Sequence, residues 1–199
     1  MSLFNNLFQS SGALRRAALC AGLAAAMALG GCQVRPLYGS STGDFGSQPS
    51  PVAAELAAID LESISSQYAN DDASRVLYNE LTYRFERGAG SGAKKYRLKV
   101  LMDIGSSEVG VEQFSDVPSA YTTTMNSTFV LSDLATDETL MTGRAFKSAS
   151  YDFSNQRFAN QRAFRDAQER VAKAVADDIA ARIAGYFAGN SRRQVAPAL

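Results

Sequence analysis

Two segments in the middle of the chain alternate between apolar and polar residues, and this period of two restricts the fold more than any other feature. In 96–104 the two sets are Tyr96, Leu98, Val100, Met102, Ile104 and Arg97, Lys99, Leu101, Asp103. Successive side chains of a strand point to opposite faces, so the alternation predicts a half-buried strand. We expect the strand to continue to Val111 after a kink at Gly105.

The second alternating segment is 121–131. Its two sets are Tyr121, Met125, Phe129, Leu131 and Thr122, Thr124, Asn126, Thr128. A turn at 132–138 and a further strand at 139–153 follow. Long strands joined by short loops favour antiparallel pairing. The segment 57–64 predicts a weaker first strand, with Ile59 and Leu61 on one face.

Two segments show helical periodicity instead. The longer, 162–187, carries an apolar stripe of Phe164, Ala167, Val171, Val175, Ile179, Ile183 and Phe187. The shorter begins at Asn70 or Asp71 and ends near Gly88, with Leu77, Leu81 and Phe85 on one stripe. We interpret the long helix as packed on the sheet. A membrane-surface helix is the alternative, but its polar face would favour Lys and Arg over mixed charges.

The order strand, helix, three strands, helix predicts an α+β fold. We expect a two-layer sandwich of two helices packed on a mostly antiparallel four-stranded sheet. The domain is predicted to span 53–189, followed by a disordered tail at 190–199.

The front of the chain has the parts of a secretory signal. Arg15 and Arg16 precede an apolar run at 17–29, which is short of the about 20 residues that a membrane-spanning helix needs. The run ends in Leu29-Gly30-Gly31-Cys32, which resembles a lipobox. We therefore predict that 1–31 is a signal peptide and that Cys32 carries diacylglycerol and an N-acyl chain. The alternative is an ordinary signal followed by an incidental cysteine.

The remaining 168 residues (199 minus 31) begin with a lipidated segment and flexible linker at 32–52, rich in Ser, Gly and Pro. Removing Arg15 and Arg16 from 20 basic and 20 acidic residues leaves a net charge of about −2, which argues against nucleic-acid binding. Besides Cys32 the chain has only Cys20, within the signal, so no disulfide is expected. The chain has no histidine, and we predict neither a metal site nor a catalytic site.

A short motif follows the lipidated cysteine. The sequence Cys32-Gln33-Val34-Arg35-Pro36-Leu37-Tyr38-Gly39 resembles the opening of the lipopolysaccharide-assembly lipoprotein family LptE. The turn at 131–136, Leu-Ser-Asp-Leu-Ala-Thr, and the segment Thr142-Gly143-Arg144 also resemble that family.

The resemblance implies a function. Members of the family sit in the outer membrane of Gram-negative bacteria, face the periplasm and plug the lumen of the β-barrel LptD. They help the barrel deliver lipopolysaccharide to the outer leaflet, and they are not enzymes. Residue 33 is Gln rather than the Asp of the usual inner-membrane retention signal, in agreement with sorting to the outer membrane. No cofactor is implied apart from the lipid on Cys32.

Lipopolysaccharide carries phosphates and acyl chains, so a site for it needs Lys or Arg beside apolar surface. The candidates are Lys95, Arg97, Lys99, Arg144 and Lys147. The polar face with Thr122, Thr124, Asn126 and Thr128 is a candidate surface for a wet barrel lumen. Ordinary solvated charge and an ordinary solvated sheet face are the alternatives.

Two other functions compete with this hypothesis. The chain could serve another envelope lipid transporter as an accessory lipoprotein. A lipid-anchored hydrolase is the less favoured option, because it would have to use paired carboxylates such as Asp71-Asp72 or Asp177-Asp178. Adjacent residues on a helix diverge by about 100°, which places such pairs poorly for joint chemistry.

Replacing the anchoring residue, Cys32→Ala, is expected to abolish incorporation of labelled fatty acid and to leave the precursor uncut or mislocalised. Circular dichroism and urea unfolding of the purified variant are expected to match the wild type, because the domain begins beyond the linker. Loss of domain stability would contradict the predicted boundary.

Overall fold

A computed structural model describes residues 50–66, 71–86, 92–111 and 118–195. The chain divides into two compact units, Met1–Pro36 and Leu37–Leu199, and every element below belongs to the second. The signal peptide, Cys32 and the motif Arg35, Pro36, Leu37, Tyr38, Gly39 lie outside the described residues, as do Asn70 and Gly88. The order is α2 (Pro51–Ala57), β1 (Ile59–Leu61), β2 (Ser65–Ser66), α3 (Asp71–Glu86), β3 (Tyr96–Val111), β4 (Pro118–Asp133), β5 (Thr139–Asp152) and α4 (Arg157–Val195).

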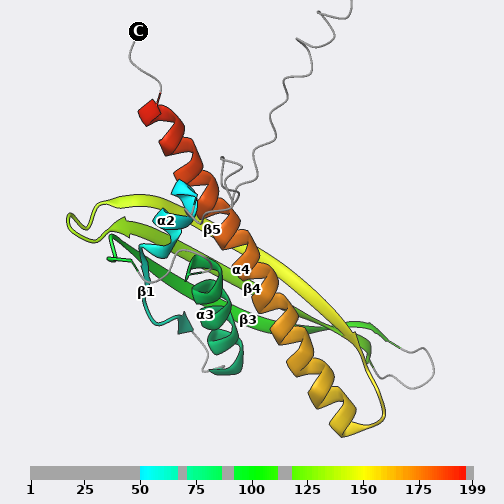
Figure 1. Ribbon diagram of the computed structural model, residues 1–199. Coiled ribbons are helices and arrows are strands. Elements are labelled where there is room, and N and C mark those ends of the chain that lie inside the picture. Colours follow the sequence, from blue (N-terminus) through cyan, green and yellow to red (C-terminus); the bar gives the residue numbers. More distant parts are fainter. Residues whose placement is uncertain (1–49, 67–70, 87–91, 112–117, 196–199) are drawn as a thin grey trace, which may run out of the picture. The chain divides into compact units, whose positions relative to one another are not determined.

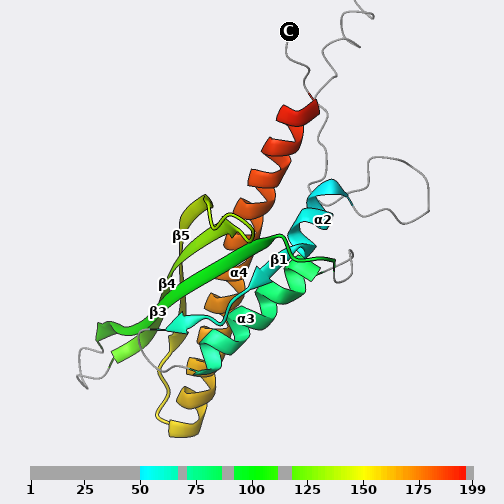
Figure 2. The ribbon, with the colours of Figure 1, turned by 90° about the vertical axis from the view of Figure 1, so that its left-hand side faces the viewer.

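The three long strands form an antiparallel meander, and the two short strands extend it in parallel. The sheet order is β1-β3-β4-β5, and β2 also pairs with β3. β1 and β2 run parallel to β3, which requires a crossover connection, and α3 lies in that connection. Figures 1 and 2 show α3 and α4 on the same side of the sheet. The α+β prediction is confirmed, but the sheet is mixed and has a fifth strand of two residues, β2, and the described residues include one additional helix, α2.

The alternation in the sequence places one face of the sheet in the core. Leu98 lies opposite Leu131, Val100 opposite Phe129, and all four are buried. They form one cluster with Leu77, Leu81 and Phe85 of α3 and with the part of the α4 stripe from Val171 to Phe187.

Helix α4 is packed against the rest of the domain along most of its length. Two rows of buried residues run along it at a spacing of four, namely Val171, Val175, Ile179, Ile183, Phe187 and Ala172, Ala176, Ala180, Ala184. The alanines let neighbouring elements approach the helix closely. This supports the interpretation of a helix packed on the sheet. Within the described part of the chain, no helix is long and apolar enough to cross a membrane.

Several element boundaries differ from the predictions. The segment 57–64 was expected to be one strand, but it begins with the end of α2 and pairs with β3 only at Ile59–Leu61, before pairing resumes at Ser65–Ser66. Ser50 caps α2 by accepting a hydrogen bond from the Ala53 N–H at 3.1 Å, and Pro51 stands at the first helical position. Helix α4 starts before and ends after the predicted 162–187, so it includes part of the predicted tail.

Two further details concern the strands and their turn. β3 is paired continuously through Gly105, which lies opposite Thr124, so the predicted kink does not interrupt the strand. In the turn after β4, the Asp133 carboxylate accepts hydrogen bonds from the Ala135 and Thr136 N–H groups at 2.9 and 3.0 Å. These bonds lower the pKa of Asp133 and close the turn.

Gly143 lies directly opposite Phe129 across β4 and β5. A Cβ atom at position 143 would meet the Phe129 ring at 2.4 Å. Phe129 is fully buried, so its ring cannot move away freely. The glycine of the Thr142-Gly143-Arg144 segment therefore has a packing role.

Replacing this glycine, Gly143→Ala, is expected to lower the free energy of unfolding by about 1–3 kcal/mol through overpacking. Gly185→Ala is the matched control, because Gly185 is an exposed helical glycine with nothing within 4 Å of the added methyl group. The free energy of unfolding of the control is expected to stay the same or to rise by up to about 1 kcal/mol, because alanine is a better helix former than glycine. Urea unfolding of both variants measures the difference, and equal effects would contradict this role of Phe129.

Candidate functional site: the open face of the sheet

The face of the sheet that points away from α3 and α4 carries the candidate site. We call it the open face and define it by the strand registers. It comprises Arg97, Lys99, Leu101 and Asp103 of β3, Thr122, Thr124, Asn126, Thr128 and Val130 of β4, and Thr142, Arg144, Phe146, Ser148 and Ser150 of β5. The predicted polar set of β4 is therefore confirmed as one face.

Basic and apolar side chains meet at the middle of the open face. Leu101, Thr128 and Arg144 lie opposite one another in one cross-strand row. The next row holds Phe146, which is 61% exposed, while Leu101 is 55% exposed. Large apolar side chains beside an arginine can contact an acyl chain and a phosphate together, since a guanidinium binds phosphate through two parallel hydrogen bonds.

The basic residues at the start of β3 are partly neutralised. Arg97 forms ion pairs with Glu62 at 3.2 Å and with Asp137 at 2.6 Å, and Lys99 lies 4.0 Å from Glu62. Lys95 precedes β3 and pairs with Glu55 of α2 at 3.7 Å. Such exposed pairs contribute little stability and can exchange partners.

The two basic residues of β5 differ in orientation. Arg144 lies on the open face opposite Thr128, whereas Lys147 lies opposite Met125 on the helix side. Neither makes a hydrogen bond or ion pair with the described residues. The structure thus brings Arg97, Lys99 and Arg144 to one face, leaves Lys95 at its end and separates Lys147 from them.

Two residues of the open face were not singled out from the sequence. Phe146 looked like any strand residue, because only the register shows which face it occupies. Asp103 lies opposite Asn126, and its Oδ1 atom is buried without a hydrogen-bond partner among the described residues.

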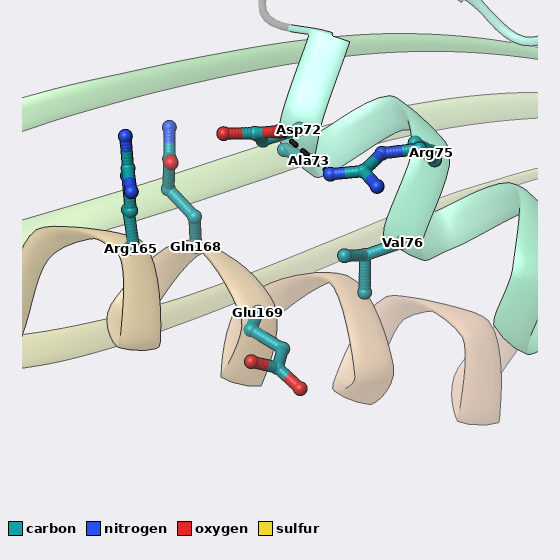
Figure 3. Close-up of a pocket in the computed structure, with 7 residues that line it drawn as sticks. All are labelled: Asp72, Ala73, Arg75, Val76, Arg165, Gln168 and Glu169. Carbon is teal, nitrogen blue, oxygen red and sulfur yellow. Dashed lines mark hydrogen bonds and ion pairs between the residues drawn. The ribbon is translucent and has the colours of Figure 1, made fainter. Parts of the chain in front are cut away.

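A hollow of about 400 Å³ lies between α3 and α4 (Figure 3). It is lined by Asp72, Ala73, Arg75, Val76, Arg165, Gln168 and Glu169. Asp72 and Arg75, both on α3, pair with each other at 2.8 Å on one side of its rim. The lining holds two arginines and two carboxylates, so it has no dominant charge.

The adjacent carboxylates have structural roles. Asp177 accepts a hydrogen bond from Arg84 at 2.7 Å, and Asp178 pairs with Arg182 at 2.9 Å. Asp72 forms the rim pair with Arg75, and the side chain of Asp71 lies outside the described set. Among the described residues, no three His, Cys, Asp or Glu side chains are grouped to hold a metal ion.

No protein-family model and no curated protein matches the chain. The chain is similar in structure to a candidate lipoprotein from Caulobacter crescentus CB15, with a TM-score of 0.52 and 21% identity over 70% of this chain and 96% of that one. This likeness establishes a shared fold. Rare lipoprotein B from Shewanella oneidensis (14% identity, 68% and 98% covered) and a minor lipoprotein from Acinetobacter baumannii (17%, 63% and 90%) each give a TM-score of 0.45.

One end of the sheet is fixed to α2 through Tyr96, whose side chain lies on the helix side. The Tyr96 hydroxyl donates a hydrogen bond to Glu55 at 2.8 Å, and its ring lies 5.0 Å from that of Phe187. Burial and the bond to the Glu55 carboxylate raise the pKa of Tyr96 to about 12. This contact joins α2, β3 and α4 at the end where the chain enters the domain.

The raised pKa of Tyr96 predicts a loss of stability in alkali. The unfolded chain releases the phenol proton near pH 10 and the folded chain near pH 12, so folding is favoured below pH 10 and weakened between pH 10 and 12. Urea unfolding should show this decline, and Tyr96→Phe should make it smaller. At pH 7 the free energy of unfolding of the variant should be about 1 kcal/mol lower, because the hydrogen bond to Glu55 is lost. An unchanged alkaline slope in the variant would contradict the assignment.

Proposed function

We propose that the chain is a lipid-anchored protein of the Gram-negative outer membrane that acts as an LptE-type component of lipopolysaccharide assembly. The observation that carries the proposal is the order of features along one chain. A lipobox cysteine is followed at once by the segment Arg35 to Gly39 and then by an α+β sandwich. The fold shared with the Caulobacter protein supports the part of the proposal that concerns a lipoprotein domain.

The open face suits the wall of a water-filled barrel. Its β4 residues are mainly threonines, and Thr122 shares a hydrogen bond of 2.8 Å with Ser150 of β5. The interior of a large membrane barrel is polar. A sheet face of hydroxyl groups can exchange hydrogen bonds with such a wall, while the buried side of the sheet keeps the domain rigid.

Lipopolysaccharide is the second partner in this proposal. Arg144 and Lys99 offer charge for its phosphates, and Leu101 and Phe146 offer apolar surface for its acyl chains. Arg97 is held by two carboxylates and has less charge to offer. On this basis we assign the contact to the middle of the open face and leave out Lys95 and Lys147.

The remaining parts of the proposal concern location and chemistry. The lipid on Cys32 holds the domain at the periplasmic side of the outer membrane, and Gln33 leaves it free to be sorted there. The protein acts by binding rather than by catalysis, and it uses no cofactor besides its own acyl chains. It binds no nucleic acid, in keeping with its net negative charge.

Mild crosslinking and purification of the lipidated chain are expected to recover a large outer-membrane β-barrel together with lipopolysaccharide. Arg144→Glu should reduce the recovered lipopolysaccharide at least tenfold, since losing a charged hydrogen bond costs about 1.5–3 kcal/mol. Lys147→Glu is the matched control, because it reverses an unpartnered charge on the same strand but on the opposite face. The control should recover wild-type amounts.

Recovery of a membrane ATPase complex would favour an accessory role in another lipid transporter. Recovery of neither partner would contradict both functions. Depletion provides an independent check, because losing the chain should leave the barrel misassembled and the cell sensitive to large hydrophobic antibiotics. Normal barrel assembly under depletion would overturn the proposal.

A further inference from the structure

The basic residues of the domain are unevenly paired. From Arg75 to Lys99, and again from Arg170 to Arg182, every described Lys or Arg side chain has an ion-pair partner. Between residues 144 and 165 none has a hydrogen bond or ion pair with the described residues. These are Arg144, Lys147, Arg157, Arg162 and Arg165. Free positive charge is thus concentrated in one short part of the chain.

Three of these residues stand at the start of α4 beside an exposed ring. We call Arg157, Phe158, Arg162 and Arg165 the arginine end. Phe158 is 70% exposed, more than any other large apolar side chain described. Phe158, Arg162 and Arg165 recur at a spacing of four and three residues, so they share one side of the helix. They line a surface hollow of about 600 Å³.

The arginine end is unfavourable in the isolated domain. A helix N-terminus carries partial positive charge and is stabilised by acidic residues, yet the first turn of α4 has none. The two carboxylates that line the same hollow are already engaged, Asp166 with Arg170 at 2.8 Å and Glu169 with Lys173 at 2.5 Å. A negatively charged surface that also accepts an aromatic ring would neutralise the arginines and bury the exposed ring of Phe158.

We propose that the arginine end is a second membrane contact, which docks on the anionic headgroups of the bilayer to which the chain is tethered. Arginines reach phosphates at the surface, and a phenylalanine on the same helix side enters the boundary between headgroups and acyl chains. Each basic residue near an anionic surface contributes about a factor of five in affinity.

The tether is long enough for this contact. The 17 residues 33–49 separate Cys32 from Ser50 and span at most about 60 Å when extended. Phe158 and Phe187 are separated by about 43 Å along α4. Phe187 lies beside Tyr96, and Tyr96 is bonded to Glu55 of α2, so the tether joins the domain near that end of α4. The lipid and the arginine end can therefore hold the two ends of α4 at one surface.

This proposal rests on the lipid anchor and not on lipopolysaccharide assembly. The two can be tested separately, because vesicles of phospholipid contain neither a barrel nor lipopolysaccharide.

The chain has no tryptophan, so Phe158→Trp introduces a single reporter at the arginine end. The lipidated full-length variant is placed on two kinds of vesicle, both made with brominated acyl chains. One contains phosphatidylethanolamine and the anionic phosphatidylglycerol, and the other contains phosphatidylethanolamine and the uncharged phosphatidylcholine. Emission should be strongly quenched on the anionic vesicles only. Tyr83→Trp, which places the reporter at an exposed ring of α3 outside both proposed contact surfaces, is the matched control and should remain unquenched on both.

Adding Arg162→Gln and Arg165→Gln to the reporter variant should lower the ratio of quenched to unquenched emission about thirtyfold, the effect of two surface charges. Salt should lower it as well. Equal quenching on both vesicles, or quenching on neither, would overturn the proposal. So would protection of the reporter only after a barrel protein is added, which would indicate a protein partner. Dissociation of the lipidated chain from both kinds of vesicle would also overturn the proposal, because the lipid would then not hold the domain at the membrane.

Discussion

The domain depends on the burial of one face of the sheet beneath α4. This helix contacts α2, α3, β4 and β5, so it joins every layer of the fold. Its two buried rows combine β-branched residues with alanines, which fill the core and allow close approach. The chain has only two cysteines, one of them within the predicted signal, so this apolar packing must hold the domain without a disulfide.

Burying one face leaves the other free for function. The open face can therefore combine threonines, an unpaired arginine and an exposed phenylalanine without loss to the core. The same separation explains why Phe129 of β4 and Phe146 of the edge strand β5 have opposite roles. Phe129 covers Gly143 within the core, whereas Phe146 is exposed beside Arg144. The arginine end lies outside this sheet altogether, at the start of α4, and offers a different kind of contact.

Part of the candidate site could be predicted from the sequence. The period of two placed Arg97 and Lys99 on one face and Thr122 to Thr128 on the matching face, because alternation is a local property of a strand. It could not show that Arg97 is held by Glu62 and Asp137, since those carboxylates come from other segments. Arg144 and Lys147 were grouped because they are close in sequence. An odd spacing of three residues, however, places their side chains on opposite faces of the sheet.

The sequence by itself determined the periodic elements, the α+β class and the lipobox hypothesis, because each depends on spacing between near neighbours. Only the tertiary structure decided that β1 and β2 run parallel to β3, that 51–57 is a helix and that α4 extends to Val195. It also decided which charges are neutralised and which remain free. These features depend on contacts between segments far apart in the chain, and a local pattern of apolar and polar residues does not predict such contacts.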